Sequence, residues 1–258
     1  MTKRYTIIAN WKMNPGTKQE ALRLFKNVLK EKALLRKIHI IVCPPFLYIS
    51  LLSLNKGKNM VSIGAQNISR LAEGPHTGEV SGSMIKSAGA THAIIGHSER
   101  RAMGETDEVI GEKMRQAMKS NLYAILAVGE SEPGEDAHRI LEEELKKALS
   151  GILLTDMKRI LIAYEPRWAI SKGKDDTGAN SDTPEHAFEK AIFIRRILAN
   201  LYNSSIAQKT PVLYGGSVRS KNISVFVNAD SPFDGALVGG ASLDAREFLE
   251  LLRRIHIK

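Results

Sequence analysis

Only one cysteine, Cys43, occurs among the 258 residues of the chain. A single thiol cannot form an internal disulfide or a multi-cysteine metal site, so both are excluded. The composition therefore excludes the disulfide-rich secreted domains and gives no support to a redox function. A reducing, cytoplasmic compartment is the location that it favours.

Long hydrophobic runs are also missing. No segment approaches the roughly 20 apolar residues that a membrane-spanning helix needs. The apolar run near the N-terminus ends at Trp11 and Lys12, before it reaches the length of a signal peptide. We therefore expect no membrane partner and no secretory signal.

Acidic residues are fewer than basic ones, 28 against 37, which gives a formal net charge of +9. Such a charge suits an anionic partner, whether nucleic acid, a membrane surface or a phosphorylated metabolite. Acids and bases alternate on helical faces, as in the run 142–147, and no basic stripe carries the stacking aromatic residues of a nucleic-acid groove. We expect a solvated basic exterior, with no nucleic-acid partner.

Eight short runs of apolar, largely β-branched residues predict β-strands. The runs cover residues 5–9, 38–42, 61–64, 93–95, 123–128, 160–164, 212–214 and 236–238. Stretches with the spacing of amphipathic helices separate them. Two of these helices have clear start signals and one apolar face each: Ala21, Leu24, Phe25 and Val28 after a capping box at Thr17 and Glu20, and Ala187, Ala191, Ile194 and Leu198 after Thr183 and Pro184.

The alternation of strands and helices implies parallel strands joined by right-handed crossovers. Eight such units fit a closed (β/α)8 barrel or an open doubly wound sheet, and periodicity alone does not choose between them. A closed barrel leaves no strand edge unpaired, and no opening strand precedes the G-x-G-x-x-G turn of a dinucleotide-binding sheet. Since no linker or composition break divides the chain, we predict one α/β domain over residues 1–258.

Polar residues that directly follow the apolar runs are the candidates for chemistry, because both architectures place their functional face at the carboxyl ends of the strands. These candidates are Asn10, Lys12, His97, Glu165, Gly215, Gly216, Ser217, Gly239 and Gly240. Taken singly, each has an ordinary explanation, such as a surface lysine or a turn glycine. Together they provide a carboxylate, an imidazole, an ammonium group and two glycine-rich segments that suit phosphate.

The histidines show no paired spacing of metal ligands such as H-E-x-x-H. We therefore expect no metal, and no feature of the chain calls for an organic cofactor. The predicted partner is a small phosphorylated molecule.

Seven segments, in order along nearly the whole chain, resemble the triosephosphate isomerase family. They are ANWKMN from residue 9, GAQN from residue 64, TGE from residue 77, IGHSERR from residue 95, AYEP from residue 163, YGGSV from residue 214 and LVGGAS from residue 237. The resemblance implies the closed barrel and the interconversion of glyceraldehyde 3-phosphate and dihydroxyacetone phosphate through an enediolate, in glycolysis and gluconeogenesis. It implies no cofactor.

The same resemblance implies a role for each catalytic residue. Glu165 is expected to act as the base, and His97 as a neutral electrophile beside a helix N-terminus, the arrangement already described for this family. Lys12 would offset negative charge on the enediolate, and Asn10 would orient it. Glu99 is expected beside Lys12, although a local ion pair with Arg100 or Arg101 is an alternative.

Phosphate binding is assigned by the resemblance to the backbone amides of Ser171, Ser217, Gly239 and Gly240, together with the Lys12 and Asn10 side chains. The resemblance also implies a homodimer formed through the loop that contains Thr77.

The sequence departs from the family pattern in several places. Ser171 and Lys172 stand where the family usually has glycine and threonine, the segment 175–182 is longer than usual, and Arg167 occupies a position that is more often neutral. The longer segment keeps open an isomerase of a longer substrate, such as a tetrose phosphate. A non-catalytic barrel is a further alternative, which the complete set of catalytic residue types argues against.

Overall fold

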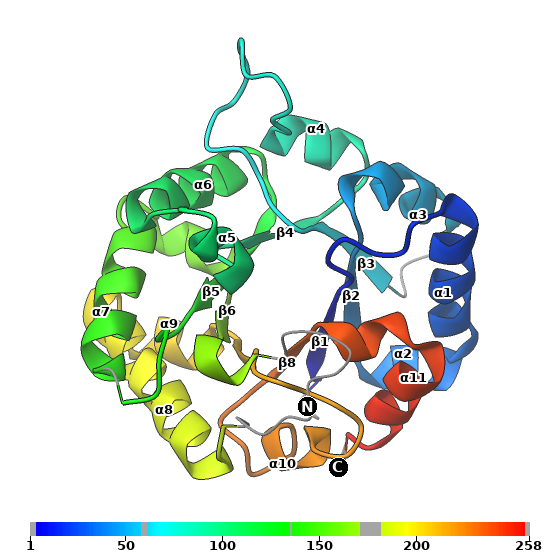
Figure 1. Cartoon of the computed structure of the whole chain (residues 1–258). Coiled ribbons are helices and arrows are strands. Elements are labelled where there is room, and N and C mark those ends of the chain that lie inside the picture. Colours follow the sequence, from blue (N-terminus) through cyan, green and yellow to red (C-terminus); the bar gives the residue numbers. More distant parts are fainter. Residues whose placement is uncertain (1–3, 58–60, 135, 171–181, 256–258) are drawn as a thin grey trace.

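The computed structural model describes residues 4–57, 61–134, 136–170 and 182–255. Eight parallel strands close into a barrel in chain order, and helices surround it (Figure 1). The strands are β1 Thr6–Asn10, β2 His39–Cys43, β3 Val61–Ala65, β4 His92–Ile95, β5 Tyr123–Val128, β6 Ile160–Tyr164, β7 Val212–Tyr214 and β8 Gly235–Val238. Each predicted run overlaps one strand, so the predicted (β/α)8 barrel is confirmed.

The helices lie on the outside of the barrel (Figure 1). The α-helices are α1 Lys18–Lys30, α2 Lys32–Lys37, α3 Ile49–Asn55, α4 Gly82–Ser87, α5 Ser98–Ala102, α6 Asp107–Lys119, α7 Ala137–Ala148, α8 Pro184–Leu201, α9 Ser204–Lys209, α10 Ile223–Phe226 and α11 Ala245–Arg253. Four short 3-10 helices add to them: η1 Phe46–Tyr48, η2 Leu154–Arg159, η3 Arg167–Ala169 and η4 Gly240–Leu243.

The two helices with clear sequence signals begin where their caps predict. The Thr17 hydroxyl accepts from the Glu20 amide at the start of α1, and the Thr183 hydroxyl accepts from the His186 amide at the start of α8. These caps satisfy amide groups that a helix start leaves without partners. The predicted apolar faces of both helices are buried, so helical periodicity located them correctly.

Closure of the barrel depends on the pairing of β1 with β8, in which Thr6 lies opposite Gly235. A Cβ atom on Gly235 would lie 1.7 Å from the Thr6 carbonyl oxygen. Only glycine allows this close approach of the first strand to the last.

The core has two layers, because successive strand residues point to opposite faces. Ile8, Ile41, Ile94, Ile125 and Leu213 belong to a cluster made of strand residues alone, which fills the barrel interior. The larger cluster combines the alternate strand residues with the apolar faces of the helices. A packed interior leaves the rims of the barrel as the places for a site.

The segment between β3 and α4 projects away from the barrel (Figure 1). Every residue from 72 to 79 is exposed, which includes His76 and Thr77. Its turn is held by backbone bonds, from the His76 amide to the Gly74 carbonyl and from the Glu79 amide to the His76 carbonyl.

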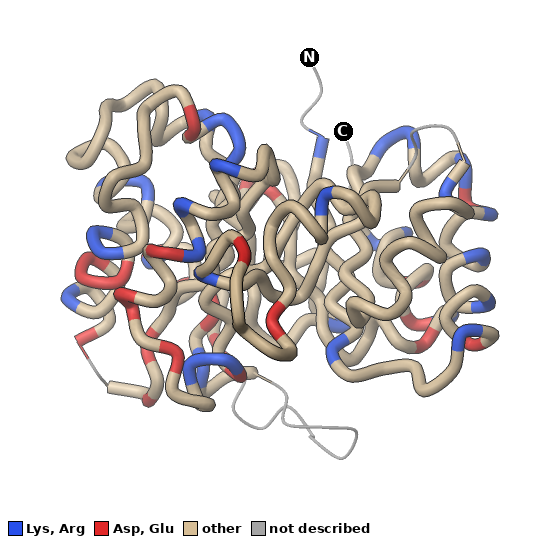
Figure 2. Tube along the Cα trace, turned by 90° about the horizontal axis from the view of Figure 1, so that it is seen from above, with Lys and Arg blue, Asp and Glu red and all other residues tan. Residues whose placement is uncertain are grey.

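Residues of both charge signs are interspersed along the trace of the described residues (Figure 2). This distribution agrees with the expected solvated exterior. Within the described ranges, no helix has the length and apolar character that crossing a membrane requires.

Candidate active site

A cavity of about 1330 Å³ opens at the carboxyl ends of the strands. Its lining brings together residues that are far apart in the sequence: Asn10, Lys12, His97, Glu99, Glu165, Gly215, Gly216, Ser217, Gly239 and Gly240. All the predicted site residues that the structure describes therefore line one cavity.

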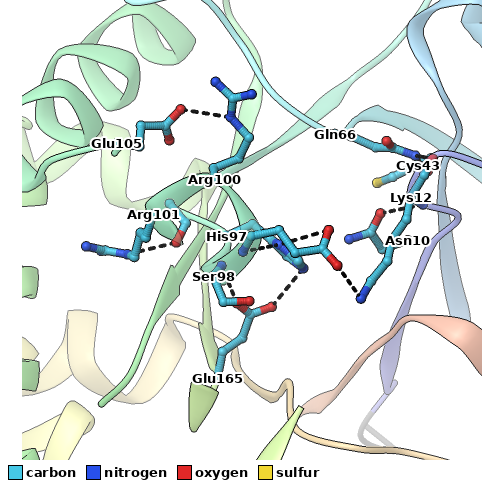
Figure 3. Close-up of polar contacts among 12 residues, drawn as sticks. Asn10, Lys12, Cys43, Gln66, His97, Ser98, Arg100, Arg101, Glu105 and Glu165 are labelled. Atoms are coloured by element: carbon cyan, nitrogen blue, oxygen red, sulfur yellow. Dashed lines mark hydrogen bonds and ion pairs between the residues drawn. The ribbon is translucent and has the colours of Figure 1, made fainter. Parts of the chain in front are cut away.

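Lys12 enters this cavity from a strained backbone. Its φ is 52°, in the left-handed region that non-glycine residues rarely adopt, and such a conformation costs on the order of 1–3 kcal/mol. The Lys12 amide donates to Asn10 Oδ1 at 3.0 Å, and Gln66 Nε2 donates to the Lys12 carbonyl at 2.8 Å (Figure 3). Gln66 also donates to the Cys43 carbonyl at 2.8 Å, so one side chain ties the strained turn to β2.

His97 caps the N-terminus of α5, and its ring is held in one tautomer. Its Nδ1 accepts from the Glu99 amide at 3.2 Å, so this nitrogen carries no proton. The proton of the neutral ring is therefore on Nε2, which lies 3.5 Å from Glu165 Oε1. The geometry aims a hydrogen-bond donor into the cavity.

Glu165 directly follows β6 and is almost fully buried. Its amide donates to the Val128 carbonyl at 2.7 Å, and its Oε2 accepts from the Ser98 amide at 3.2 Å (Figure 3). A Cβ atom on Gly129 would lie 2.0 Å from the Glu165 carbonyl oxygen, and one on Gly215 would lie 2.7 Å from Glu165 Cγ. Gly129 therefore makes room for the backbone of Glu165, and Gly215 makes room for its side chain. The contact of Gly215 with Glu165 adds to the phosphate role expected for its segment.

Glu99, the acidic residue of the IGHSERR segment, pairs with Lys12 and not with the two arginines that follow it. Glu99 Oε1 lies 2.7 Å from Lys12 Nζ (Figure 3). Arg100 pairs with Glu105 at 3.1 Å and Arg101 with Asp107 at 2.6 Å. Glu99 therefore lies beside Lys12, as the family resemblance implies, and not in a local ion pair with Arg100 or Arg101.

The expected phosphate residues lie on the β7 and β8 side of the cavity. Gly239 approaches Lys12, because a Cβ atom there would lie 3.3 Å from Lys12 Cε, whereas a Cβ on Gly240 would meet nothing within 4 Å. The Ser217 amide donates to the Ala169 carbonyl at 3.1 Å, so it must exchange that partner to bind phosphate. Ser171, the fourth expected amide, lies outside the described residues.

One acid that the sequence placed on the solvated exterior is buried. Glu144, in the run 142–147, has a side chain only 6% exposed. It accepts from the Gly129 amide at 2.9 Å and pairs with Arg101 and Arg167. Burial raises the pKa of this carboxyl, and the two arginines oppose that effect. Because Glu144 stands in a run of glutamates, the sequence alone did not indicate that its side chain is buried.

Within the part of the chain that the structure describes, no group of three or more His, Cys, Asp and Glu side chains is arranged to hold a metal ion.

Comparison with known proteins agrees with this arrangement. The sequence model of the triosephosphate isomerase family matches residues 5–255. The chain belongs to the triosephosphate isomerase family. The triosephosphate isomerase of Dehalococcoides mccartyi is 39% identical over 98% of this chain and 96% of its own length. The triosephosphate isomerase of Shewanella sediminis is 41% identical, over 96% of each chain.

A third relative, the triosephosphate isomerase of Natranaerobius thermophilus, is 40% identical over 96% of this chain and 94% of its own length. The match to the triosephosphate isomerase family thus spans all eight strands and every described residue of the cavity. The resemblance stated from the seven sequence segments is confirmed.

Proposed function

We propose that this chain catalyses the interconversion of glyceraldehyde 3-phosphate and dihydroxyacetone phosphate. One observation carries the proposal: Glu165 and His97 lie 3.5 Å apart in a cavity that also contains Lys12. A carboxylate base, a neutral donor and a fixed positive charge are the groups that proton transfer between adjacent carbons requires.

Glu165 is the proposed base. In the reaction it removes a proton from the carbon that carries the substrate hydroxyl group and returns it to the neighbouring carbon. Its carboxylate lines the cavity, where Oε2 accepts from the Ser98 amide at 3.2 Å. The supporting observation is that its backbone is fixed to β5 through Val128.

His97 and Lys12 are proposed to stabilise the enediolate. The Nε2 proton of His97 is donated to the oxygen on which negative charge develops, and the Lys12 ammonium lies on the same side of the cavity. Asn10 orients the substrate oxygens and fixes the Lys12 turn. Glu99 is proposed to hold the Lys12 ammonium in place between turnovers.

The backbone amides of Ser217, Gly239 and Gly240 are proposed to bind the phosphate group, together with that of Ser171. Amides near Gly240 meet the phosphate without side-chain obstruction, since the space where its Cβ would lie is open. The net charge of +9 favours the approach of an anionic substrate.

The assembly and setting of the enzyme are also proposals. The exposed segment 72–79 projects away from the barrel, and Met13 beside Lys12 is 93% exposed, which supports a homodimer through the loop containing Thr77 (Figure 1). The single buried cysteine supports a cytoplasmic location. The reaction belongs to glycolysis and gluconeogenesis.

A longer sugar phosphate, such as a tetrose phosphate, is the second candidate substrate. The observation that favours it is the size of the cavity, which extends from the catalytic residues to Arg23 on α1 and Arg246 on α11. Kinetics with triose and tetrose phosphates side by side distinguish the two, and a much larger kcat/KM for the triose eliminates the tetrose.

Substitution Glu165→Gln tests the proposed function. We expect kcat to fall by about 10²–10⁴-fold, because the amide cannot accept the carbon-bound proton. A coupled assay with glyceraldehyde 3-phosphate measures the effect. Glu143→Gln is the matched control, since Glu143 is exposed and pairs only with Arg139 on its own helix. Equal rates for Glu165→Gln and the wild type would disprove the role of Glu165.

A further inference from the structure

Arg167 places a positive charge two residues after the proposed base. Its side chain extends from η3 to two partners. Nη1 donates to Ser131 Oγ, in the loop after β5, at 2.7 Å, and Nη2 donates to the Glu144 carboxylate on α7. Its amide donates to the Glu130 carbonyl at 2.9 Å. Both the backbone and the side chain of Arg167 are therefore fixed to the loop after β5 or to α7.

Glu144 is the centre of this contact network. Its Oε1 forms an ion pair with Arg101, 3.2 Å from Nη1, and accepts from Arg167 Nη2, while its Oε2 accepts from the Gly129 amide at 2.9 Å. Arg101 follows β4, Gly129 follows β5 and Arg167 follows β6. One carboxylate thus connects three consecutive loops on the rim of the barrel.

At its two ends this network contacts the backbone next to His97 and the backbone of Glu165. Arg101 Nε donates to the carbonyl of Gly96 at 2.9 Å, and Gly96 directly precedes His97 (Figure 3). At the other end, Gly129 packs on the backbone of Glu165, with no space for a Cβ atom. A shift of Glu144 would therefore move the backbone beside His97 and the backbone of Glu165.

Arg167 also balances the charge of the cluster. Without it, the single positive charge of Arg101 faces two carboxylates, Asp107 at 2.6 Å and Glu144 at 3.2 Å. Lys147 approaches Asp107 only at 3.7 Å and is half-exposed. A buried carboxylate that loses one of its cations is strongly destabilised, so it rearranges or admits water.

We propose that Arg167 is a positioning residue for the reaction, which through Glu144 sets the separation of Glu165 from His97. This inference rests on the proposed isomerase function. Reacting groups that are displaced by about 1 Å lose up to about 10²-fold in rate, so a small relaxation of the network has a measurable effect.

The test compares Arg167→Met with Arg139→Met. Both substitutions remove an Arg–Glu pair with α7, but the Arg139 pair with Glu143 is exposed and distant from the cavity lining. For Arg167→Met we expect kcat to fall on the order of 10-fold and KM to change by less than about twofold. For Arg139→Met we expect both constants to stay at the wild-type values.

Two further measurements separate positioning from stability alone. The inhibition constant of inorganic phosphate should be unchanged in Arg167→Met, because Gly239 and Gly240 lie outside the network. Arg167→Lys should recover most of kcat, since it restores the charge beside Glu144. If Arg167→Met yields no folded protein by circular dichroism, Arg167→Gln, which keeps a donor but removes the charge, is measured in its place with the same expected loss.

A kcat for Arg167→Met within twofold of wild type, with only a lower melting temperature, would overturn the positioning role while leaving the isomerase function intact. A wild type without any triose phosphate turnover would overturn both. A loss of kcat that Arg167→Lys restores, with phosphate inhibition unchanged, supports the proposal.

Discussion

Two histidines at opposite ends of β4 are buried to nearly the same degree but have different surroundings. His97, after the carboxyl end of the strand, is 6% exposed, and His92, at its amino end, is 4% exposed. His97 faces Glu165 across a cavity. His92 instead bonds to the Thr91 hydroxyl at 2.7 Å and stacks on Tyr123 with ring centroids 4.9 Å apart.

The difference shows that burial alone does not make a histidine part of an active site. Around His92 the described residues supply a hydroxyl, an aromatic ring and a second imidazole, that of His39, and burial lowers its pKa to about 3. Around His97 the backbone fixes the tautomer, and the free nitrogen faces a carboxylate. What distinguishes His97 from His92 is that His97 lines the cavity and faces a carboxylate there.

The largest effect should come from replacing the two histidines in turn. We expect His97→Gln to lower kcat by about 10²–10³-fold, because a donor to the developing oxyanion is lost or displaced. His92→Gln should leave kcat within about twofold, because His92 does not line the cavity. Steady-state kinetics at one pH measures both. Similar losses in the two variants would contradict the division between the two ends.

A smaller effect should separate two lysines in the same way. We expect Lys12→Met to lower kcat/KM by about 10–100-fold, the equivalent of one lost hydrogen bond to a charged group. Lys86 lies toward the amino end, where its Nζ donates to the Asn121 carbonyl at 3.0 Å. Lys86→Met is therefore the control and should leave kcat/KM unchanged. If Lys12→Met kept wild-type constants, its contact with substrate would be ruled out.

The smallest effect concerns stability at the amino end. The pKa of His92 is about 3 in the folded chain, below the value of 6.5 for a free imidazole, so between these values the unfolded chain binds a proton that the folded chain does not. Stability therefore falls as pH is lowered from 6.5 toward 3, by up to about 1.4 kcal/mol per pH unit for one such group. His39, whose pKa burial also lowers, adds to the same trend.

Urea unfolding of His92→Phe at pH 6.5 and pH 5 tests this expectation. The wild type should lose about 2 kcal/mol more than the variant between the two pH values. Lys56 and Lys86 also disfavour the charged ring, so their effect on the His92 pKa is part of the difference that is measured. Parallel losses in the two proteins would show that His92 already carries a proton in the folded chain.

Much of the carboxyl end could be predicted from the sequence. Apolar runs located all eight strands, and the polar residues after them proved to line one cavity, because parallel strands bring their carboxyl ends to one rim. Closure of the barrel was harder to predict from the sequence. Periodicity reports which residues are buried, but it carries no information on whether β1 pairs with β8.

The connections behind the site could not be predicted. Glu144 lies in a run of three glutamates, and only the helix orientation relative to Arg101 and Arg167 makes it a buried partner. Gln66 was part of a recognised segment, yet its bonds to the Lys12 and Cys43 carbonyls depend on tertiary structure. Contacts between separate rim loops leave no local pattern in the chain.

The pairing of β1 with β8 has a consequence for how the protein is made on the ribosome. Lys12 leaves the ribosome long before Gly239, which lies against it in the folded chain. Until β8 has left the exit tunnel, β1 exposes an unpaired edge that can pair with other strands. The complete cavity and the protection of the β1 edge therefore both form only when β8 is in place.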